Sequence, residues 1–357
     1  MNSYLTALIA ELPSDHLITI TGAIAPLRNG DVHYPFRQDS DFLYLTGLSV
    51  PGLILTIFSD QIILWREAIT DLDRVWGSDK ISDNEIVRIA GIVDIRDRSD
   101  LELYRSGKKE TNDDAVRDII HSLRLIKTPD EIEKIRQAIS ISQEAFSHIE
   151  SILQPGMYEY EIEAEVARIF RSHHLTEAYP SIVASGPNSC VLHYSAHMRQ
   201  LEEGDLVLID AGAEYMGYAS DMTRTFAVSG FAPRQLAVYE AVDRVKKIAE
   251  NTLSPGISLT EYEQIVRVAM NEELTNLGLI PPDATEDEVA KLSRKYYPHR
   301  TSHFLGLDVH DVGPRDTLLV PGMVLTIEPG IYISDEQIGF RIEDDYLITE
   351  TGCEKLS

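Results

Sequence analysis

The chain has 357 residues, more than the roughly 100–200 residues of a usual single domain, so two domains are expected. Its 58 acidic residues outnumber the 32 basic ones and give a net charge of −26, which would repel nucleic acid and anionic membrane surfaces. No apolar run approaches the roughly 18 residues of a transmembrane helix. A secretory signal would have Lys or Arg before its apolar stretch, and the first apolar stretch of this chain has neither. Cys190 and Cys353 are the only cysteines, so we expect a reduced, cytoplasmic setting without a disulfide framework.

The first part of the chain mixes short strands with amphipathic helices. Residues 53–58 and 61–65 are β-type runs separated by two residues, which is the spacing of a β-hairpin. Residues 85–90 and 111–124 carry apolar side chains at helical spacing. Read from its residues alone, the segment 28–47 is a polar loop that enters a strand, and no function follows from it.

A long helix is predicted to begin after Thr128. Thr128 is a suitable N-cap, Pro129 suits the first helical position, and Glu131 completes the pattern of a capping box. We place the domain boundary just before this helix, which divides the chain into residues 1–124 and 125–357.

The second part of the chain alternates between helices and hairpins, which predicts a mixed α/β (α+β) fold. No internal repeat of the solenoid type and no low-complexity segment is found. Helices are expected at residues 159–174, 234–253 and 259–277, and extended segments at 205–209, 218–228, 323–333 and 340–349.

The first of two acidic hairpins carries Asp210 and Asp221. A turn centred near Tyr215 and Met216 would set the two acids directly opposite each other, with Cβ atoms about 4.5–5.5 Å apart. Two carboxylates at that distance repel each other unless a cation lies between them. If the turn lies elsewhere, both acids are ordinary solvated charges, and this hairpin alone leaves the two interpretations open.

The second hairpin repeats the pattern with Glu328 and Glu343, around a turn centred near Asp335 and Glu336. Glu328 ends an apolar run and precedes Pro329, so its strand stops and its side chain can face a cavity. Glu-Pro-Gly also occurs in surface loops, so this pair alone is weak evidence. Its recurrence in two hairpins favours a shared cation site.

Histidines lie between the two hairpins. His299, His303 and His310 fall within twelve positions after a Gly-poor helical stretch, and His193 lies in another short apolar run. A single such histidine is usually a satisfied core residue, but a group of them near four acids indicates a site.

Four carboxylates and at least one imidazole suit a pair of divalent cations with mainly oxygen ligands. Two such cations, about 3.5–4 Å apart, can activate a water molecule and polarise a carbonyl group. The predicted reaction class is metal-assisted hydrolysis, most simply of an amide.

These motifs closely resemble the proline-specific metallopeptidases of the pita-bread fold, aminopeptidase P and prolidase, over essentially the whole chain. The resemblance implies a C-terminal pita-bread catalytic domain and a smaller α/β N-terminal domain like that of aminopeptidase P, which segment 28–47 also resembles. Methionine aminopeptidases share the catalytic fold but lack such a domain. The matching motifs begin at Asp210 and Ser220, at Ser302, at Thr326 and at Arg341.

The resemblance also implies a role for each site residue. Two divalent cations, with manganese expected and cobalt or zinc as alternatives, would be bound by Asp210, Asp221, His303, Glu328 and Glu343, with Asp221 and Glu343 as bridges. Glu328 would also shuttle a proton to the leaving proline nitrogen. His193 and His310 would orient the peptide and stabilise the tetrahedral intermediate. His299 would lie near the proline pocket. Tyr332 and Arg341 would support the metal site and the substrate by hydrogen bonds.

The activity implied is that of aminopeptidase P, which removes the first residue from peptides with proline in second position. The alternatives are a prolidase acting on Xaa-Pro dipeptides, a non-catalytic pita-bread peptide-binding module and a creatinase-like hydrolase; the complete ligand set disfavours the last two. A homodimer or higher homo-oligomer is expected by analogy. Arg300, where the family commonly has Gly, and a shorter N-terminal domain are the two departures, and both bear on peptide-length specificity.

Overall fold

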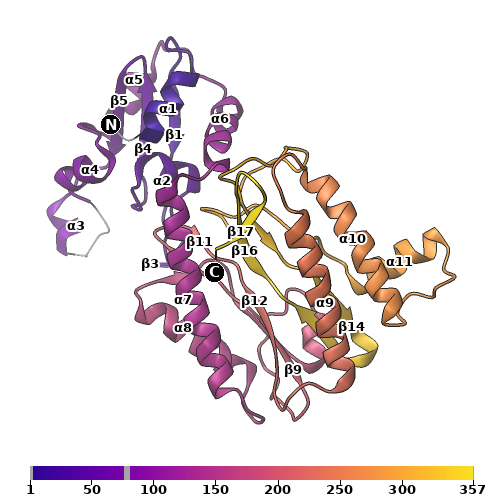
Figure 1. The fold of residues 1–357 in the computed structure, drawn as a ribbon. Helices are drawn as coiled ribbons and strands as arrows, with labels where there is room; N and C mark the ends of the chain where they lie inside the picture. The colour runs from indigo at the N-terminus through magenta and orange to yellow at the C-terminus, as the bar shows by residue number, and fades with distance from the viewer. Residues whose placement is uncertain (1–2, 76–80, 357) are drawn as a thin grey trace. The chain divides into compact units, whose positions relative to one another are not determined.

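The computed structural model describes residues 3–75 and 81–356 (Figure 1). Contacts between Cα atoms divide the chain into two compact units, Met1–Arg124 and Leu125–Ser357. In the described part of the chain, no helix combines the length and the apolar character that a membrane crossing demands.

The first unit is built on a four-stranded sheet with the order β1-β4-β5-β6. The predicted hairpin is confirmed, because Phe58 pairs with Gln61 across a two-residue turn. The predicted helices at 85–90 and 111–124 are also present. The elements are α1 (Ser3–Glu11), β1 (Ile18–Thr21), β2 (Leu27–Asn29), β3 (Val32–His33), α2 (Ser40–Thr46), β4 (Ile54–Phe58), β5 (Gln61–Arg66), α3 (Asp71–Val75), α4 (Asp83–Ala90), β6 (Asp94–Asp97), α5 (Leu101–Arg105) and α6 (Asp113–Leu125).

Instead of the predicted polar loop that enters a strand, the segment 28–47 holds the short paired strands β2 and β3 and then leads into a helix. It enters the helix α2, whose N-cap Asp39 accepts a hydrogen bond from the backbone N–H of Phe42 at 2.9 Å. Phe42 and Leu45 are fully buried on one face of this helix, and Gly47 ends it in the left-handed conformation. The short apolar run therefore forms a capped helix because its buried side chains are three residues apart.

The second unit begins with the long helix α7 (Pro129–Ile152), as predicted. The side chain of Thr128 accepts a hydrogen bond from Glu131, whose carboxylate accepts one from the backbone N–H of Thr128 at 2.8 Å. Glu131 is buried at this capping box, and the hydroxyl of Tyr218 donates to its second oxygen at 2.9 Å. The start of α7 is thus tied to a strand of the same unit.

The remaining predicted helices are found within two residues of their expected ends, and strands fill the space between them. Figure 1 shows the strands of this unit between α7 and α8 on one side and α9 and α10 on the other. The elements are α8 (Glu159–Ser172), β7 (Thr176–Glu177), β8 (Ile182–Ser185), β9 (Leu206–Asp210), β10 (Ala213–Tyr215), β11 (Tyr218–Ala219), β12 (Thr223–Ala227), α9 (Pro233–Thr252), α10 (Leu259–Asn276), α11 (Glu286–Tyr296), β13 (Val324–Ile327), β14 (Gly330–Ile333), β15 (Ile338–Arg341), β16 (Asp344–Ile348) and β17 (Cys353–Lys355).

Three of the predicted extended segments are interrupted, each at or beside a candidate acid. The segment 218–228 breaks between β11 and β12 around Asp221, and 323–333 breaks between β13 and β14 at Glu328. The segment 340–349 breaks between β15 and β16 at Glu343. The apolar runs on either side of each break are buried in the core. The position of the acidic residue at each break is therefore fixed by the packed strands on both sides of it.

Candidate active site

The first acidic hairpin differs from its predicted register. Strands β9 and β12 pair Asp210 with Thr223, so Asp221 is not directly opposite Asp210. The turn lies at Met216 and Gly217, both with positive φ, one position later than expected. A shift of one position in the turn centre moves the partner by two residues, which keeps it on the same face of the sheet. Asp221 therefore lies diagonal to Asp210.

The hydroxyl group of Tyr179 contacts the carboxylates of both Asp210 and Asp221. Its hydroxyl oxygen lies 2.7 Å from Oδ1 of Asp210 and 2.6 Å from Oδ1 of Asp221. A hydroxyl group has one proton, so it donates to one carboxylate at a time. Sequence reasoning missed Tyr179, because it precedes both acids by more than thirty residues and belongs to no motif at its own position.

The second acidic hairpin has the predicted register. Ile327 pairs with Asp344 and Gly330 with Arg341, which places Glu328 opposite Glu343. Both glutamates lie in the breaks between successive strands of the two runs. The apolar residues on each side hold the two strands together, so the carboxylates face each other across the break.

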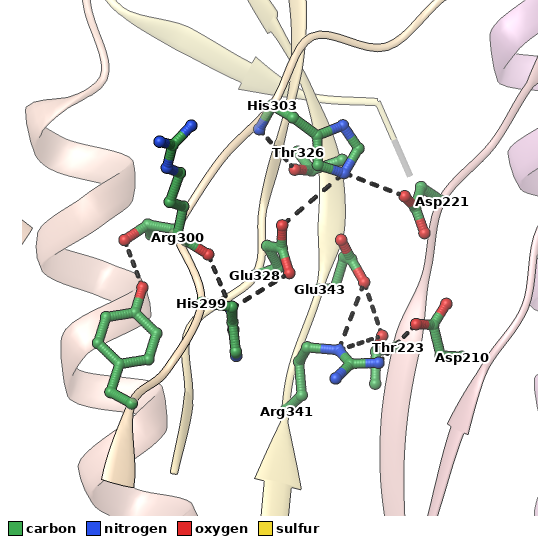
Figure 2. A network of polar contacts seen from close by, with 12 residues as sticks. Asp210, Asp221, Thr223, His299, Arg300, His303, Thr326, Glu328, Arg341 and Glu343 are labelled. Atoms are coloured by element: carbon green, nitrogen blue, oxygen red, sulfur yellow. Dashed lines mark hydrogen bonds and ion pairs between the residues drawn. The ribbon is translucent and has the colours of Figure 1, made fainter. Parts of the chain in front are cut away.

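The two acidic hairpins are joined at Thr223. The backbone N–H of Glu343 donates to the carbonyl of Thr223 at 3.1 Å, and the Thr223 hydroxyl donates to Oε2 of Glu343 at 2.6 Å. The buried guanidinium of Arg341 donates to the Thr223 hydroxyl, to Oδ2 of Asp210 and to the hydroxyl of Tyr332. Arg341 thus crosses from one hairpin to the other and supplies a fixed positive charge beneath the acids (Figure 2).

His303 faces the same acids. Its Nε2 lies 3.3 Å from Oδ2 of Asp221 and 3.7 Å from Oε1 of Glu328, while Nδ1 is 3.0 Å from the carbonyl of Phe304. A carbonyl oxygen can only accept, so Nδ1 carries a hydrogen and Nε2 is directed toward the acids. One ligand atom each from Asp221, His303 and Glu343 lies within 4.8 Å of the other two, close enough to hold one ion.

The acids of this cluster are poorly accommodated without a cation. Burial, and then the charges of Asp221 and Asp210, raise the pKa of Glu328 to about 8. Burial, and then the charges of Asp221 and Glu328, raise the pKa of Glu343 well above its usual value. Burial alone would lower the pKa of His303, but its hydrogen bond to Asp221 and the charge of Glu328 raise it to about 9. Four carboxylates with one imidazole are the donor set of hard divalent cations, so these residues fit such ions.

Asp345 is a second residue that sequence reasoning did not include in the site. It is buried, and its Oδ2 accepts a hydrogen bond from the backbone N–H of Asp221 at 3.0 Å. Burial, and then the charge of Asp221, raise the pKa of the Asp345 carboxyl well above its usual value. Asp345 therefore fixes the backbone at the break where Asp221 leaves the strand.

His299 lies on the other side of Glu328. Its Nε2 is 2.8 Å from the hydroxyl of Tyr332, and its Nδ1 is 2.8 Å from the carbonyl of Arg300 and 3.5 Å from Oε2 of Glu328. Burial, and then the charge of Arg341, lower the pKa of His299 to about 3, so the imidazole is neutral at neutral pH. Nδ1 donates to the carbonyl, and Nε2 accepts from Tyr332.

One cavity of about 570 Å³ brings nine of the ten predicted site residues together. His193 and His310 line its exposed part, and the ring of His310 lies 4.4 Å from that of His303 at 77°. The tenth residue, Tyr332, is buried behind His299 and Arg341 rather than on the cavity wall. The cavity can hold a short peptide over the acids, with imidazole groups above it.

Family models match both units of this chain. The model described as "Metallopeptidase family M24" matches residues 133–350, and that described as "Aminopeptidase P, N-terminal domain" matches residues 5–115. The chain belongs to metallopeptidase family M24. With this membership, the predicted combination of an N-terminal domain and a C-terminal mixed α/β metallopeptidase domain is confirmed.

Individual proteins resemble this M24 chain over nearly its whole length. The Xaa-Pro aminopeptidase of Escherichia coli (strain K12) is 33% identical, covering 98% of this chain and 92% of that protein. The Xaa-Pro aminopeptidase of Haemophilus influenzae is 34% identical, covering 97% of this chain and 91% of that protein. The solved structure of proline aminopeptidase P II from Yersinia pestis superposes with a TM-score of 0.92 at 32% identity, covering 99% of this chain and 94% of that one.

Proposed function

We propose that this M24 metallopeptidase is an Xaa-Pro aminopeptidase, which releases the first residue from peptides with proline in second position. The observation that carries the proposal is the buried cluster of four carboxylates and His303 in one cavity, within a chain that matches Xaa-Pro aminopeptidases over nearly its full length. The substrates of such an enzyme are peptides. A prolidase, which cleaves Xaa-Pro dipeptides, is the alternative.

Asp210, Asp221, His303, Glu328 and Glu343 would hold two divalent cations, with manganese as the expected metal and cobalt or zinc as alternatives. When bound, the cations supply an activated water molecule and polarise the scissile carbonyl. Arg341 and Tyr179 hold the carboxylates in place by hydrogen bonds. The five ligand side chains come from five places in the sequence, which is why their geometry depends on the whole second unit.

Glu328 would move the proton that the reaction requires. An Xaa-Pro bond is a tertiary amide, and its nitrogen must gain a proton before the proline can leave. The Glu328 carboxylate faces the cavity between His299 and His303, where it can take a proton from water and pass it on. It would take a proton as water attacks the carbonyl and deliver it to the proline nitrogen.

The histidines and Tyr332 would bind and orient the peptide. His193 and His310 line the exposed part of the cavity, where an N–H donor can stabilise the negative charge that develops on the scissile oxygen. His299 is held neutral and is fixed by Tyr332 and Arg300, so it offers a rigid wall beside Glu328 for the proline ring.

The remaining parts of the proposal concern the whole chain. Residues 125–357 would carry the chemistry, and residues 1–124 would form the aminopeptidase P N-terminal domain. A homodimer or higher oligomer is proposed by analogy with the resembling family, and a cytoplasmic location is proposed because the chain has only two cysteines.

Peptide hydrolysis with measured metal content tests this function. The metal-free protein is loaded with manganese, cobalt or zinc, and release of the first residue is measured for Ala-Pro, Ala-Pro-Ala and Ala-Pro-Ala-Ala. Cleavage of the longer peptides supports an aminopeptidase, whereas cleavage of the dipeptide alone would make the protein a prolidase. A protein that binds no divalent metal and cleaves none of the peptides would instead be a binding module.

A glutamate variant completes this experiment. Glu328→Gln keeps the size of the side chain but removes its charge and its ability to accept the proton, so turnover is expected to fall at least about a hundredfold. Glu272→Gln is the matched control, because Glu272 is an exposed glutamate on α10 outside the acidic cluster and outside the active-site cavity.

A further inference from the structure

A second cavity lies beside the candidate active site, behind His299. It has a volume of about 610 Å³ and is formed by α10, α11 and the segment 298–300. His299 lines both cavities, and its Nδ1 is 3.5 Å from Oε2 of Glu328. His299 is therefore common to the wall of the second cavity and to that of the active-site cavity. Each further residue of an extended peptide spans about 3.5 Å, so the leaving part of a peptide that runs past His299 would enter the second cavity.

Arginines give this second cavity a positive charge, although the chain as a whole carries −26. Arg267, Arg294 and Arg300 line it, together with a single acid, Glu286. Arg267 forms an ion pair with Glu263 at 3.1 Å, so its charge is offset. Arg294 and Arg300 have no acid within ion-pair distance in the part of the chain that the structure describes. Two unpaired guanidinium groups thus face a cavity next to the active site.

The backbone around Arg300 is fixed. His299 donates from Nδ1 to the carbonyl of Arg300 at 2.8 Å, and Arg267 donates to the carbonyl of His299 at 2.9 Å. In Figure 2 the side chain of Arg300 extends away from Glu328. Burial, and then the positive charge of Arg300, lower the pKa of Arg315, so these two guanidinium groups are close enough to repel each other. A bound anion would relieve this repulsion.

The active-site cavity has acids on other elements. Glu163 on α8 and Glu177 on β7 line it and are half-buried. Burial, and then the charge of Glu163, raise the pKa of Glu177, so this pair would be stabilised by a cation. The ammonium group at the start of a peptide substrate is such a cation. A peptide with its ammonium group near these acids has its leaving part free to extend past His299 toward the arginines.

We propose that Arg300, assisted by Arg294, binds a carboxylate on the leaving part of the substrate. This contact would give the enzyme a preference for peptides in which the residue after the proline carries a carboxylate. The proposal rests on the proposed Xaa-Pro aminopeptidase function. The carboxylate is either the C-terminus of a tripeptide or an acidic side chain in third position, because both present two oxygens to a guanidinium group. Arg300 stands where the resembling family commonly has Gly, so this recognition belongs to the present chain.

Four matched peptides test the proposal on the manganese-loaded protein: Ala-Pro-Ala, its C-terminal amide, Ala-Pro-Asp-amide and Ala-Pro-Asn-amide. We expect kcat/KM to be about threefold to tenfold higher for the tripeptide acid than for its amide, and for the Asp peptide than for the Asn peptide, as for a partly exposed charged contact. The difference in kcat/KM within each pair should arise from KM, because the contact forms when the peptide binds, before the reaction. This difference should become smaller as the salt concentration is raised. Preference in only one of the two pairs identifies which carboxylate is bound.

Two variants link the preference to Arg300. Arg300→Gln is expected to bring both ratios close to one, and to weaken inhibition by Pro-Ala relative to Pro-Ala-amide. Arg168→Gln is the matched control, because it removes one positive charge from an exposed position on α8 outside both cavities and should keep both ratios. Equal kcat/KM within both pairs in the unmodified protein, or an unchanged preference in Arg300→Gln, would overturn the proposal. Failure to cleave any of the four peptides would instead contradict the proposed function itself.

Discussion

Lys127 and Asp311 form a buried ion pair, with Nζ and Oδ2 2.9 Å apart and each side chain 1% exposed. Lys127 directly precedes the cap of α7, and Asp311 directly follows His310. The pair therefore ties the start of the long helix to the segment that carries the three candidate histidines His299, His303 and His310.

Removing one partner of this pair should be costly. Lys127→Met removes the ammonium group from this buried pair, and the free energy of unfolding should fall by about 3–5 kcal/mol. Urea unfolding followed by circular dichroism measures the change. The control is Lys247→Met, which breaks the more exposed pair with Asp243 on α9 and should cost about 0–1 kcal/mol. An equal, small effect of both substitutions would contradict a structural role for the buried pair.

The hydroxyl of Tyr179 should matter for metal binding. Tyr179→Phe removes the group that contacts both Asp210 and Asp221, so both carboxylates lose an orienting partner. Loss of such a contact behind a metal ligand typically weakens metal affinity by about 10–100-fold. Competition with a chelating dye measures the affinity for manganese. Tyr239→Phe, outside the active-site cavity, should leave it unchanged, and an unaltered affinity in Tyr179→Phe would show that the hydroxyl is dispensable.

The contrast between the two acidic hairpins shows how far sequence patterns reach. For Glu328 and Glu343, the turn centre read from the sequence is the one in the structure, so their opposition was predicted. For Asp210 and Asp221, a turn shifted by one position changed the partner by two residues. Both acids still lie on one face, because a shift of two preserves the side of the strand. The membership of the cluster was thus easier to predict than its geometry.

Helices with local signals were predicted well, and contacts between distant segments were not. The capping box of α7 lies within four consecutive residues, so its start could be read directly. The contact of Tyr179 with Asp210 joins residues 31 positions apart, and that of Asp345 with Asp221 joins residues 124 apart. No periodicity or motif at Tyr179 or Asp345 reports such contacts, because tertiary packing alone creates them.

Removal of the metal should destabilise the protein. Without cations, burial and the neighbouring acids raise the pKa of Glu328 to about 8 and the pKa of Glu343 well above its usual value, so folding at neutral pH has to protonate these carboxyls, whereas bound ions would stabilise their charged forms. At a free metal concentration of 100 times the Kd, one site that binds only the folded state adds about 2.7 kcal/mol. Thermal unfolding with a chelator, and then with increasing manganese, measures this gain.

A double variant provides the control for metal removal. Glu328→Gln with Glu343→Gln replaces two carboxyls that the metal-free fold has to protonate by neutral amides, so the metal-free protein should unfold at a higher temperature and respond little to manganese. A melting temperature of the unmodified protein that does not change with manganese would contradict the metal site. The same rise in both proteins would locate the stabilising ion elsewhere.

Gly212 lies where the chain just after Asp210 passes very close to the chain just before Asp221. A Cβ atom at this position would lie 1.8 Å from the carbonyl oxygen of Ser220 and 3.0 Å from the ring of Tyr179. Gly212→Ala must therefore push these two segments apart, at a cost of about 1–3 kcal/mol in the free energy of unfolding. Because Asp210 and Asp221 flank this contact, their separation should also increase, and the affinity for manganese should fall with the stability. Gly352→Ala is the control, since its Cβ would meet nothing within 4 Å, and it should change neither quantity. If Gly212→Ala retained both the stability and the affinity, the two segments would have to relax without moving the acids, and the close approach would have no role in placing them.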